Sequence, residues 1–296
     1  MPTVTKRIHV EPEVERQPGP VTVYRAEGES SSRQMRDDLI RRAERWREHF
    51  GLRAEPADLG ERIVYLSESA ALEVYLATDS VWWTDRSRAY QEITSDRVPG
   101  DEQAVELARR FVAGTFEPRA ELRTAHVGEQ VASFSDGPDT EARSQRVGVA
   151  VTLRPTLDDL DVFGPGAKVR IAFSDSEEPS DVAYFSRPVQ PDGQVDVIHP
   201  YQAVERLSRD RRFTGVLEAG MELRIRRLEL GYYSAGPSMS QRYLVPVYLA
   251  AGQVEGSELD ADVFRLYLPA VDLGSKDMKE LGVRANPTVA GSFTSF

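Results

Sequence analysis

Apolar residues recur at helical spacing near the start of the chain. Between residues 32 and 50 they are separated by steps of four, four, three and four residues, a spacing that puts them on one face of a helix. These residues are Met35, Leu39, Ala43, Trp46 and Phe50. The other positions of this segment carry interleaved arginines and acids. We interpret them as a solvated face with local ion pairs, and an arginine-rich site for a polyanion is the alternative.

Two further helices are predicted, and strands follow each of them. Asp101 is the expected N-cap of the second helix, and Pro200 opens the third. Alternation of apolar and polar residues predicts strands at residues 62–66, 71–76, 81–84, 121–127, 130–134, 146–153, 168–173, 182–185, 221–233, 242–250 and 264–268. The short turns between these strands favour antiparallel pairing and leave no room for parallel crossovers.

The order of these elements predicts an α+β fold of tandem helix-on-antiparallel-sheet units with flexible N- and C-terminal arms. Residues 1–31 are polar and rich in proline, so we expect a flexible arm. Within it, residues 21–24 alternate and are a hypothetical edge strand for this domain or for a neighbouring chain. A helix with a β-meander is expected at 32–98, helix-plus-sheet units at 99–196 and 197–271, and a polar tail at 272–296.

Composition excludes several classes of protein. The chain has 37 Lys and Arg against 48 Asp and Glu, a net charge of -11, which argues against nucleic-acid binding. It has no cysteine, which excludes disulfides, thiolate metal sites and cysteine nucleophiles. Since neither a membrane span nor a signal peptide is recognisable, we expect a soluble chain, cytoplasmic by default, with an extracellular or assembly-associated location as alternatives.

A search for catalytic or metal-binding motifs finds none with the required spacing. The histidines are far apart in the sequence and do not match a zinc motif: His9, His49, His126 and His199. The glycine-rich segment 163–168 leads into a strand, which predicts a turn into a hairpin rather than a phosphate-binding loop. The acidic segments 158–161 and 175–178 lack the spacing of a calcium loop. We therefore expect no metal and no cofactor.

Aromatic residues form the candidate binding surface. Trp82 and Trp83 precede Arg86 and Arg88, an arrangement that suits an aromatic ligand platform. Several tyrosines gather late in the chain, on strands expected to be neighbours. The candidate surface comprises Trp82, Trp83, Tyr232, Tyr233, Tyr243 and Tyr248. Packing of these rings in the core or on a sheet surface is the favoured alternative.

Three parts of the chain resemble repeats of PepSY-like domains. They are the helix at 101–112, the segment 162–171, and the segments 228–233 and 243–248, so that the likeness extends over about residues 101–250. The resemblance implies a helix packed on a small antiparallel sheet, often in tandem, and binding, inhibition or sensing without catalysis. PepSY-like proteins usually carry a signal peptide or a membrane anchor, and neither is recognisable here.

The preferred hypothesis is a non-catalytic interaction, regulatory or structural protein that binds a protein partner or assembles with itself as a homo-oligomer. The alternative is an enzyme whose pocket forms between the units from Tyr, Trp, Asp and Arg side chains. A deep pocket lined by the tryptophans and by Tyr232 and Tyr233, with a buried and strongly shifted carboxylate, would favour the enzyme.

Overall fold

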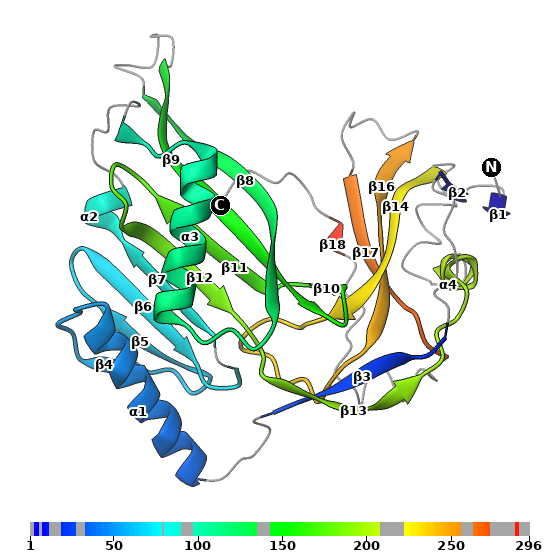
Figure 1. Cartoon of the computed structure of the whole chain (residues 1–296), viewed down its shortest axis with the longest axis horizontal. Coiled ribbons are helices and arrows are strands. Elements are labelled where there is room, and N and C mark those ends of the chain that lie inside the picture. The colour runs from blue at the N-terminus through cyan, green and yellow to red at the C-terminus, as the bar shows by residue number, and fades with distance from the viewer. Residues whose placement is uncertain are drawn as a thin grey trace.

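Strands dominate the structure. The computed structural model describes residues 3–5, 8–11, 19–27, 33–78, 80–89, 97–134, 143–207, 222–255, 263–272 and 288–289. Within these ranges there are four helices, of which only two exceed eight residues (Figure 1): α1 Arg33–His49, α2 Arg86–Ala89, α3 Asp101–Thr115 and α4 Pro200–Leu207. None of them is long and apolar enough to cross a membrane.

One large mixed sheet passes through the whole molecule. Among the described residues it has 15 strands, and its main path runs in the order β18-β17-β16-β14-β10-β9-β11-β12-β7-β6-β5-β4. The strands of this sheet are β1 Thr3–Thr5, β2 Ile8–Val10, β4 Pro56–Asp58, β5 Arg62–Leu66, β6 Ala70–Tyr75, β7 Val81–Asp85, β8 Glu121–Phe134, β9 Arg143–Leu157, β10 Leu160–Phe163, β11 Lys168–Phe173, β12 Pro179–Phe185, β14 Glu222–Tyr233, β16 Pro246–Glu255, β17 Val263–Pro269 and β18 Thr288–Val289. A separate three-stranded sheet has the order β13-β3-β15, with β13 Val189–Val195, β3 Val21–Ala26 and β15 Tyr243–Leu244.

The expected α+β class of tandem helix-on-sheet units is wrong. The sheet continues across the boundary that was placed between residues 196 and 197, because β10 pairs with β14 in parallel and Val162 lies opposite Tyr232. Parallel pairing needs a long connection, and the residues between these two strands provide it. The sequence pattern predicts pairing only between strands that are adjacent in the sequence, and β10 and β14 are not adjacent.

Parts of the expected flexible arm belong to the fold. β2 pairs in parallel with β14, and the side chains of Ile8 and Val10 are 0% exposed. The alternation at 21–24 does form a strand, but β3 pairs on both sides within this chain and is not an edge. The polar tail expected at 272–296 lies outside the described residues apart from Asp272 and β18.

Elements that depend on local spacing agree with the expectations. α1 matches the apolar stripe, with Ala43 0% exposed and Trp46 and Phe50 packed against the core, while the side chains of Met35 and Leu39 lie outside the described part. The meander β5-β6-β7 and the β11-β12 hairpin are also present. The N-cap of α3 is Gly100 rather than Asp101. The two strands expected between 121 and 134 are one strand, β8.

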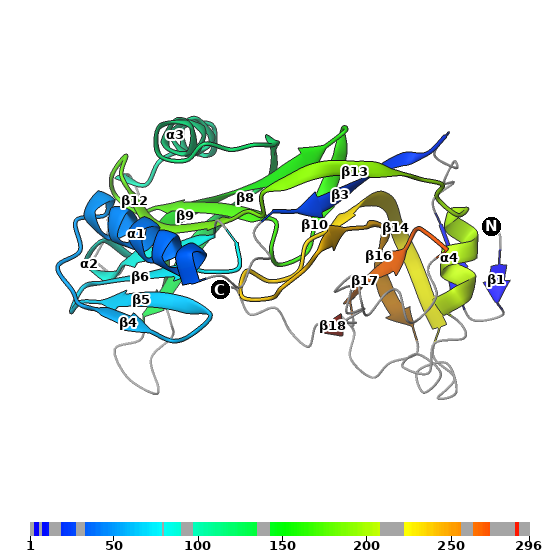
Figure 2. The ribbon, with the colours of Figure 1, turned by 90° about the horizontal axis from the view of Figure 1, so that it is seen from below.

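Two large apolar cores and two smaller clusters support the described part of the fold. Ala43 of α1 and Ala104 and Ala108 of α3 share one core with strands β5, β6, β7, β9, β11 and β12. The second core joins α4 to β2, β14, β16 and β17. Figure 2 shows these two groups of elements at opposite ends of the molecule, with β3 and β13 running between them. The first core brings the C-terminal ends of α1 and α3 together over the end of β12, where the candidate site lies.

Candidate functional site

The six aromatic residues of the expected binding surface do not form one surface. Four are buried, with exposed fractions of 7% for Trp83, 0% for Tyr232, 7% for Tyr233 and 2% for Tyr248. Trp82 is half-buried and points to the opposite face of β7 from Trp83. Tyr243 is half-buried, and the Arg242 guanidinium lies 5.4 Å from the centre of its ring. The buried rings stabilise the core and are not available to a ligand.

Two of these tyrosines join separate parts of the fold. The Tyr232 hydroxyl donates to the carbonyl oxygen of Thr22 at 2.9 Å, which attaches β3 to β14. The Tyr248 hydroxyl donates to the carbonyl oxygen of Ile198 at 2.7 Å, just before α4. Burial raises the pKa of Tyr232, so its hydroxyl stays protonated. The clustering of tyrosines therefore reflects packing with satisfied hydroxyl groups.

Asp181 is the carboxyl group that comes nearest to the enzyme alternative. Burial raises its pKa, while Arg170 and the indole of Trp82 lower it. The Arg170 guanidinium donates to the carboxylate at 2.7 Å, so the group is held in an ion pair. Asp181 lines neither of the two cavities described below. Its environment is that of a structural ion pair across β11 and β12.

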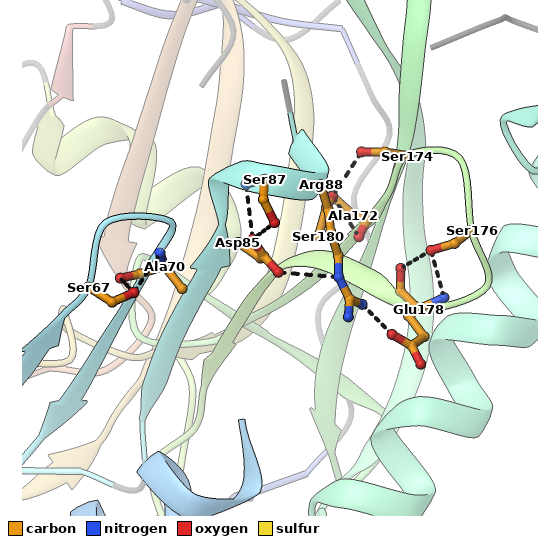
Figure 3. A network of polar contacts seen from close by, with 10 residues as sticks. All are labelled: Ser67, Ala70, Asp85, Ser87, Arg88, Ala172, Ser174, Ser176, Glu178 and Ser180. Atoms are coloured by element: carbon orange, nitrogen blue, oxygen red, sulfur yellow. Dashed lines mark hydrogen bonds and ion pairs between the residues drawn. The ribbon is translucent and has the colours of Figure 1, made fainter. Parts of the chain in front are cut away.

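The acidic loop before β12 binds an arginine. Arg88 of α2 pairs with Asp85, with 3.2 Å between Nε and Oδ2, and also with Glu178 of this loop (Figure 3). The N–H of Ser87 donates to Asp85 at 2.9 Å, next to the start of α2. No group of three or more His, Asp or Glu residues in the described ranges could hold a metal ion. The loop thus fastens α2 to the β11-β12 hairpin.

The glycine-rich segment 163–168 is a site of close backbone contact. A Cβ atom added at Gly166 would lie 1.8 Å from the carbonyl oxygen of Ala235, so a larger residue cannot fit there. The N–H of Gly166 donates to the carbonyl oxygen of Ser234 at 3.2 Å. The segment brings two loops together and joins β10 to β11, which lie on either side of β9. β11 then pairs with β12, so the segment leads into a hairpin, as expected.

A cavity of about 400 Å³ opens between the C-terminal ends of α1 and α3. We call it the arginine groove, because three of its lining residues are arginines. Its lining comprises Arg42, Arg45, Trp46, His49, Thr115, Phe116, Glu117, Arg119, Tyr184, Ser186 and Pro188. Since the lining comes from α1, from the loop after α3 and from the end of β12, only the folded chain brings these residues together.

Stacked rings form the floor of the arginine groove. The rings of Phe116 and Tyr184 are parallel, with centroids 4.0 Å apart and an interplanar angle of 4°. Trp46 lies against Phe116 with centroids 4.8 Å apart. Phe116 is the C-cap of α3 and has an extended backbone, which turns the chain away from the helix and places the ring over β12. Such pairs pack rigidly. Phe116 and Tyr184 are only 5% and 6% exposed, so of these three rings the half-buried Trp46 is the one that is open to a ligand.

Arginines surround this floor. Burial, and to a smaller extent the charge of Arg45, lowers the pKa of Arg42. Arg119 forms an ion pair with Glu27 at 2.5 Å. Among the lining residues Glu117 is the acidic one, so the groove is positive in a chain whose net charge is -11. Guanidinium groups bind carboxylates and phosphates in a planar, two-pronged geometry.

The sequence interpretation kept an arginine-rich anion site on the first helix only as the alternative and did not assign its residues, because it treated all the arginines of that helix alike. Arg41 and Arg47 do form the expected local ion pairs, with Asp38 and with Glu44. Arg42 and Arg45 line the groove. The available signal was the spacing of i, i+3, i+4 and i+7 on one helix face, shared by Arg42, Arg45, Trp46 and His49.

A second cavity of about 380 Å³ adjoins the groove between the large sheet and the three-stranded sheet. We call it the inner cavity. Its lining comprises Tyr24, Arg119, Ala120, Glu121, Pro155, Thr156, Leu157, Asp158, Val162, Gly166, Ala167, Ser186, Arg187, Val189, Pro191, Ser234 and Leu244. Arg119 and Ser186 line both cavities.

Comparisons with known proteins do not indicate a function. No family model matches the chain, and no curated protein matches it. Among solved structures, the chain is similar to the crystal structure of an uncharacterised protein from Eubacterium rectale ATCC 33656, with a TM-score of 0.46 and 11% identity over 91% of this chain and 90% of that chain. At that TM-score and identity the neighbour informs neither fold nor function. The resemblance to PepSY-like domains stays a prediction.

Proposed function

We propose that this protein is a non-catalytic binding protein that holds an acidic segment of a protein partner in the arginine groove. The observation that carries the proposal is the convergence of Arg42, Arg45 and Arg119 around the stacked rings of Phe116 and Tyr184. These arginines come from a helix and from a loop about 75 residues further along the chain, so the positive site is a product of the fold.

The chemistry of the lining supports binding over acid–base catalysis. Guanidinium groups stay protonated at ordinary pH, so they hold anions without exchanging protons. Burial raises the pKa of Tyr184, which keeps its hydroxyl protonated as well. The half-buried ring of Trp46 contributes apolar area that an inorganic anion would not use. A segment with carboxylates on both sides of an aromatic side chain matches both features of the groove.

The test uses a capped pentapeptide with two aspartates on each side of a phenylalanine as the probe. Its affinity for the full chain is measured by calorimetry and by tryptophan fluorescence, to which Trp46 in the groove contributes alongside Trp82 and Trp83. The variant carrying Arg42→Gln and Arg45→Gln is expected to lose about tenfold for each arginine, because a charge-assisted hydrogen bond contributes about 1.5–3 kcal/mol. Affinity should also fall with added salt.

Arg41→Gln is the matched control. Arg41 lies on the same helix, is 69% exposed and pairs with Asp38 outside the groove, so its loss should leave the affinity unchanged. Equal affinity in the wild type and the double variant would overturn the proposal, as would an equal loss in the control. Thermal melts of all variants show whether the fold is intact. If the chain forms a dimer that only the double variant abolishes, the partner is a second copy of this chain.

A further inference from the structure

The arginine groove and the inner cavity are neighbouring cavities that share part of their lining. Two segments of the chain pass along both of them. After α3, Glu117 lines the groove, Arg119 lines both cavities and Glu121 lines the inner cavity. After β12, Pro188 lines the groove and the next residue, Val189, lines the inner cavity. Both segments therefore run from the groove to the inner cavity, and Arg119 and Ser186 line both.

The inner cavity combines apolar walls with buried polar groups. Val162 and Leu244 belong to one apolar cluster with Tyr24, and each of these side chains is at least nine-tenths buried. Burial and a hydrogen bond with Asp158 raise the pKa of Tyr24 to about 12, so its hydroxyl is a donor. Ser234 is 1% exposed, and its Oγ has no hydrogen-bond partner within the described structure. A buried hydroxyl without a partner loses free energy that a polar ligand can restore.

A carboxylate of this chain already forms an ion pair with Arg119, the arginine that lines both cavities. Glu27 follows β3, and its side chain pairs with Arg119 at 2.5 Å. The N–H of Glu27 donates to the carbonyl oxygen of Pro188 at 2.8 Å, which fixes Glu27 beside the segment that lines the groove. The side chains of Glu27 and Arg119 are 40% and 62% exposed, so solvent reaches the pair and it can be exchanged.

We infer that the acidic segment lies extended through both cavities, and that one of its carboxylates replaces Glu27 on Arg119. This inference rests on the proposed function. The exchange forms one ion pair and breaks another, so Glu27 is a built-in competitor for the ligand. It weakens the binding of anions and favours segments that also fill the inner cavity.

The first experiment measures the affinity of the aspartate–phenylalanine pentapeptide for Glu27→Gln. Removal of the competing carboxylate should raise the affinity, by up to about fivefold for an exposed ion pair. Glu178→Gln is the control: it changes the net charge equally, but Glu178 pairs with Arg88 at another part of the surface. Beyond about one Debye length its effect is screened, so its affinity should equal that of the wild type.

The second experiment compares the pentapeptide with a peptide extended by four apolar and serine residues. The longer peptide should bind the wild type at least tenfold more tightly. Val189→Phe narrows the inner cavity, so it should cancel this gain.

Each failure has a distinct meaning. If Glu27→Gln and Glu178→Gln bind the probe alike, Glu27 is not a competitor and the exchange is wrong. If the two peptides bind the wild type with equal affinity, the extended path is wrong, whether or not Val189→Phe folds. In both cases a loss of affinity in the double arginine variant would still support the proposed function.

Discussion

The N-terminal strand β2 offers the sharpest test of the fold, because the sequence places it in a flexible arm. In the structure Val10 is 0% exposed and lies opposite Ile225 of β14. Val131 on β8 is 56% exposed. The variants Val10→Ala and Val131→Ala therefore make the same chemical change in a buried and in an exposed position.

The expected cost follows from burial. Valine to alanine removes two carbon groups, which is worth about 1.6 kcal/mol at about 0.8 kcal/mol per buried carbon. The cavity that remains adds to this, so Val10→Ala should lower the free energy of unfolding by about 2–3 kcal/mol. Val131→Ala should stay within about 0.5 kcal/mol of the parent, because its side chain is already in contact with water.

Thermal melts followed by circular dichroism measure the difference. At about 2–4 °C per kcal/mol, Val10→Ala should lower the melting temperature by about 4–12 °C, and Val131→Ala should leave it almost unchanged. Equal melting temperatures for the two variants would refute the pairing of β2 with β14. The N-terminal residues would then be an arm, as the composition suggests.

Three further predictions concern titration, close packing and the groove. The free energy of unfolding should fall between about pH 10 and 12, by about 1.4 kcal/mol per pH unit for each tyrosine of raised pKa, because the tyrosines of the unfolded chain ionise first. Tyr24, whose pKa is raised to about 12, is one of these tyrosines, so urea titrations of Tyr24→Phe across this pH range should show a shallower fall. A slope equal to that of the parent would contradict the raised pKa of Tyr24. Gly252→Ala should destabilise the chain by about 1–3 kcal/mol, because the new Cβ would lie 1.9 Å from the carbonyl oxygen of Arg224. Gly114→Ala, whose new Cβ has no atom within 4 Å, should stabilise α3 by up to about 1 kcal/mol. Denaturation midpoints that move in the same direction for the two variants would count against the close packing at Gly252. Trp46→Ala should lower the free energy of unfolding by less than about 3–5 kcal/mol, the contribution of a fully buried aromatic ring, since part of the Trp46 ring faces the groove. A calorimetric loss of about 3 kcal/mol or more would show that Trp46 is a core residue instead.

Local periodicity predicted the elements whose energies depend on neighbours in the sequence. The stripe through Ala43 and Trp46 predicts α1, because residues three and four apart share a helix face. Alternation predicts β5, β6 and β7, and short turns predict their antiparallel pairing. The negative net charge and the lack of cysteine were likewise evident from the sequence.

Only the tertiary structure decided how these elements join. The parallel pairs of β14 with β10 and with β2 link strands that are far apart in the sequence, so no local pattern specifies them. Non-local contacts of this kind depend on the total apolar area buried in the assembled sheet, which offsets the entropy of closing the long connections.

The same distinction holds for the candidate site. The sequence predicts a helix rich in arginine, but the side chains of Arg41 and Arg45 look equivalent in it. The packing of α1 beside Phe116 and Tyr184 leaves Arg41 in solvent and places Arg45 in the groove. Tyrosine and arginine side chains are stable both at the edge of an apolar core and on the solvent-exposed surface, because each has an apolar body and a polar end. The fold, through the neighbours that it supplies, decides which of the two environments each side chain occupies.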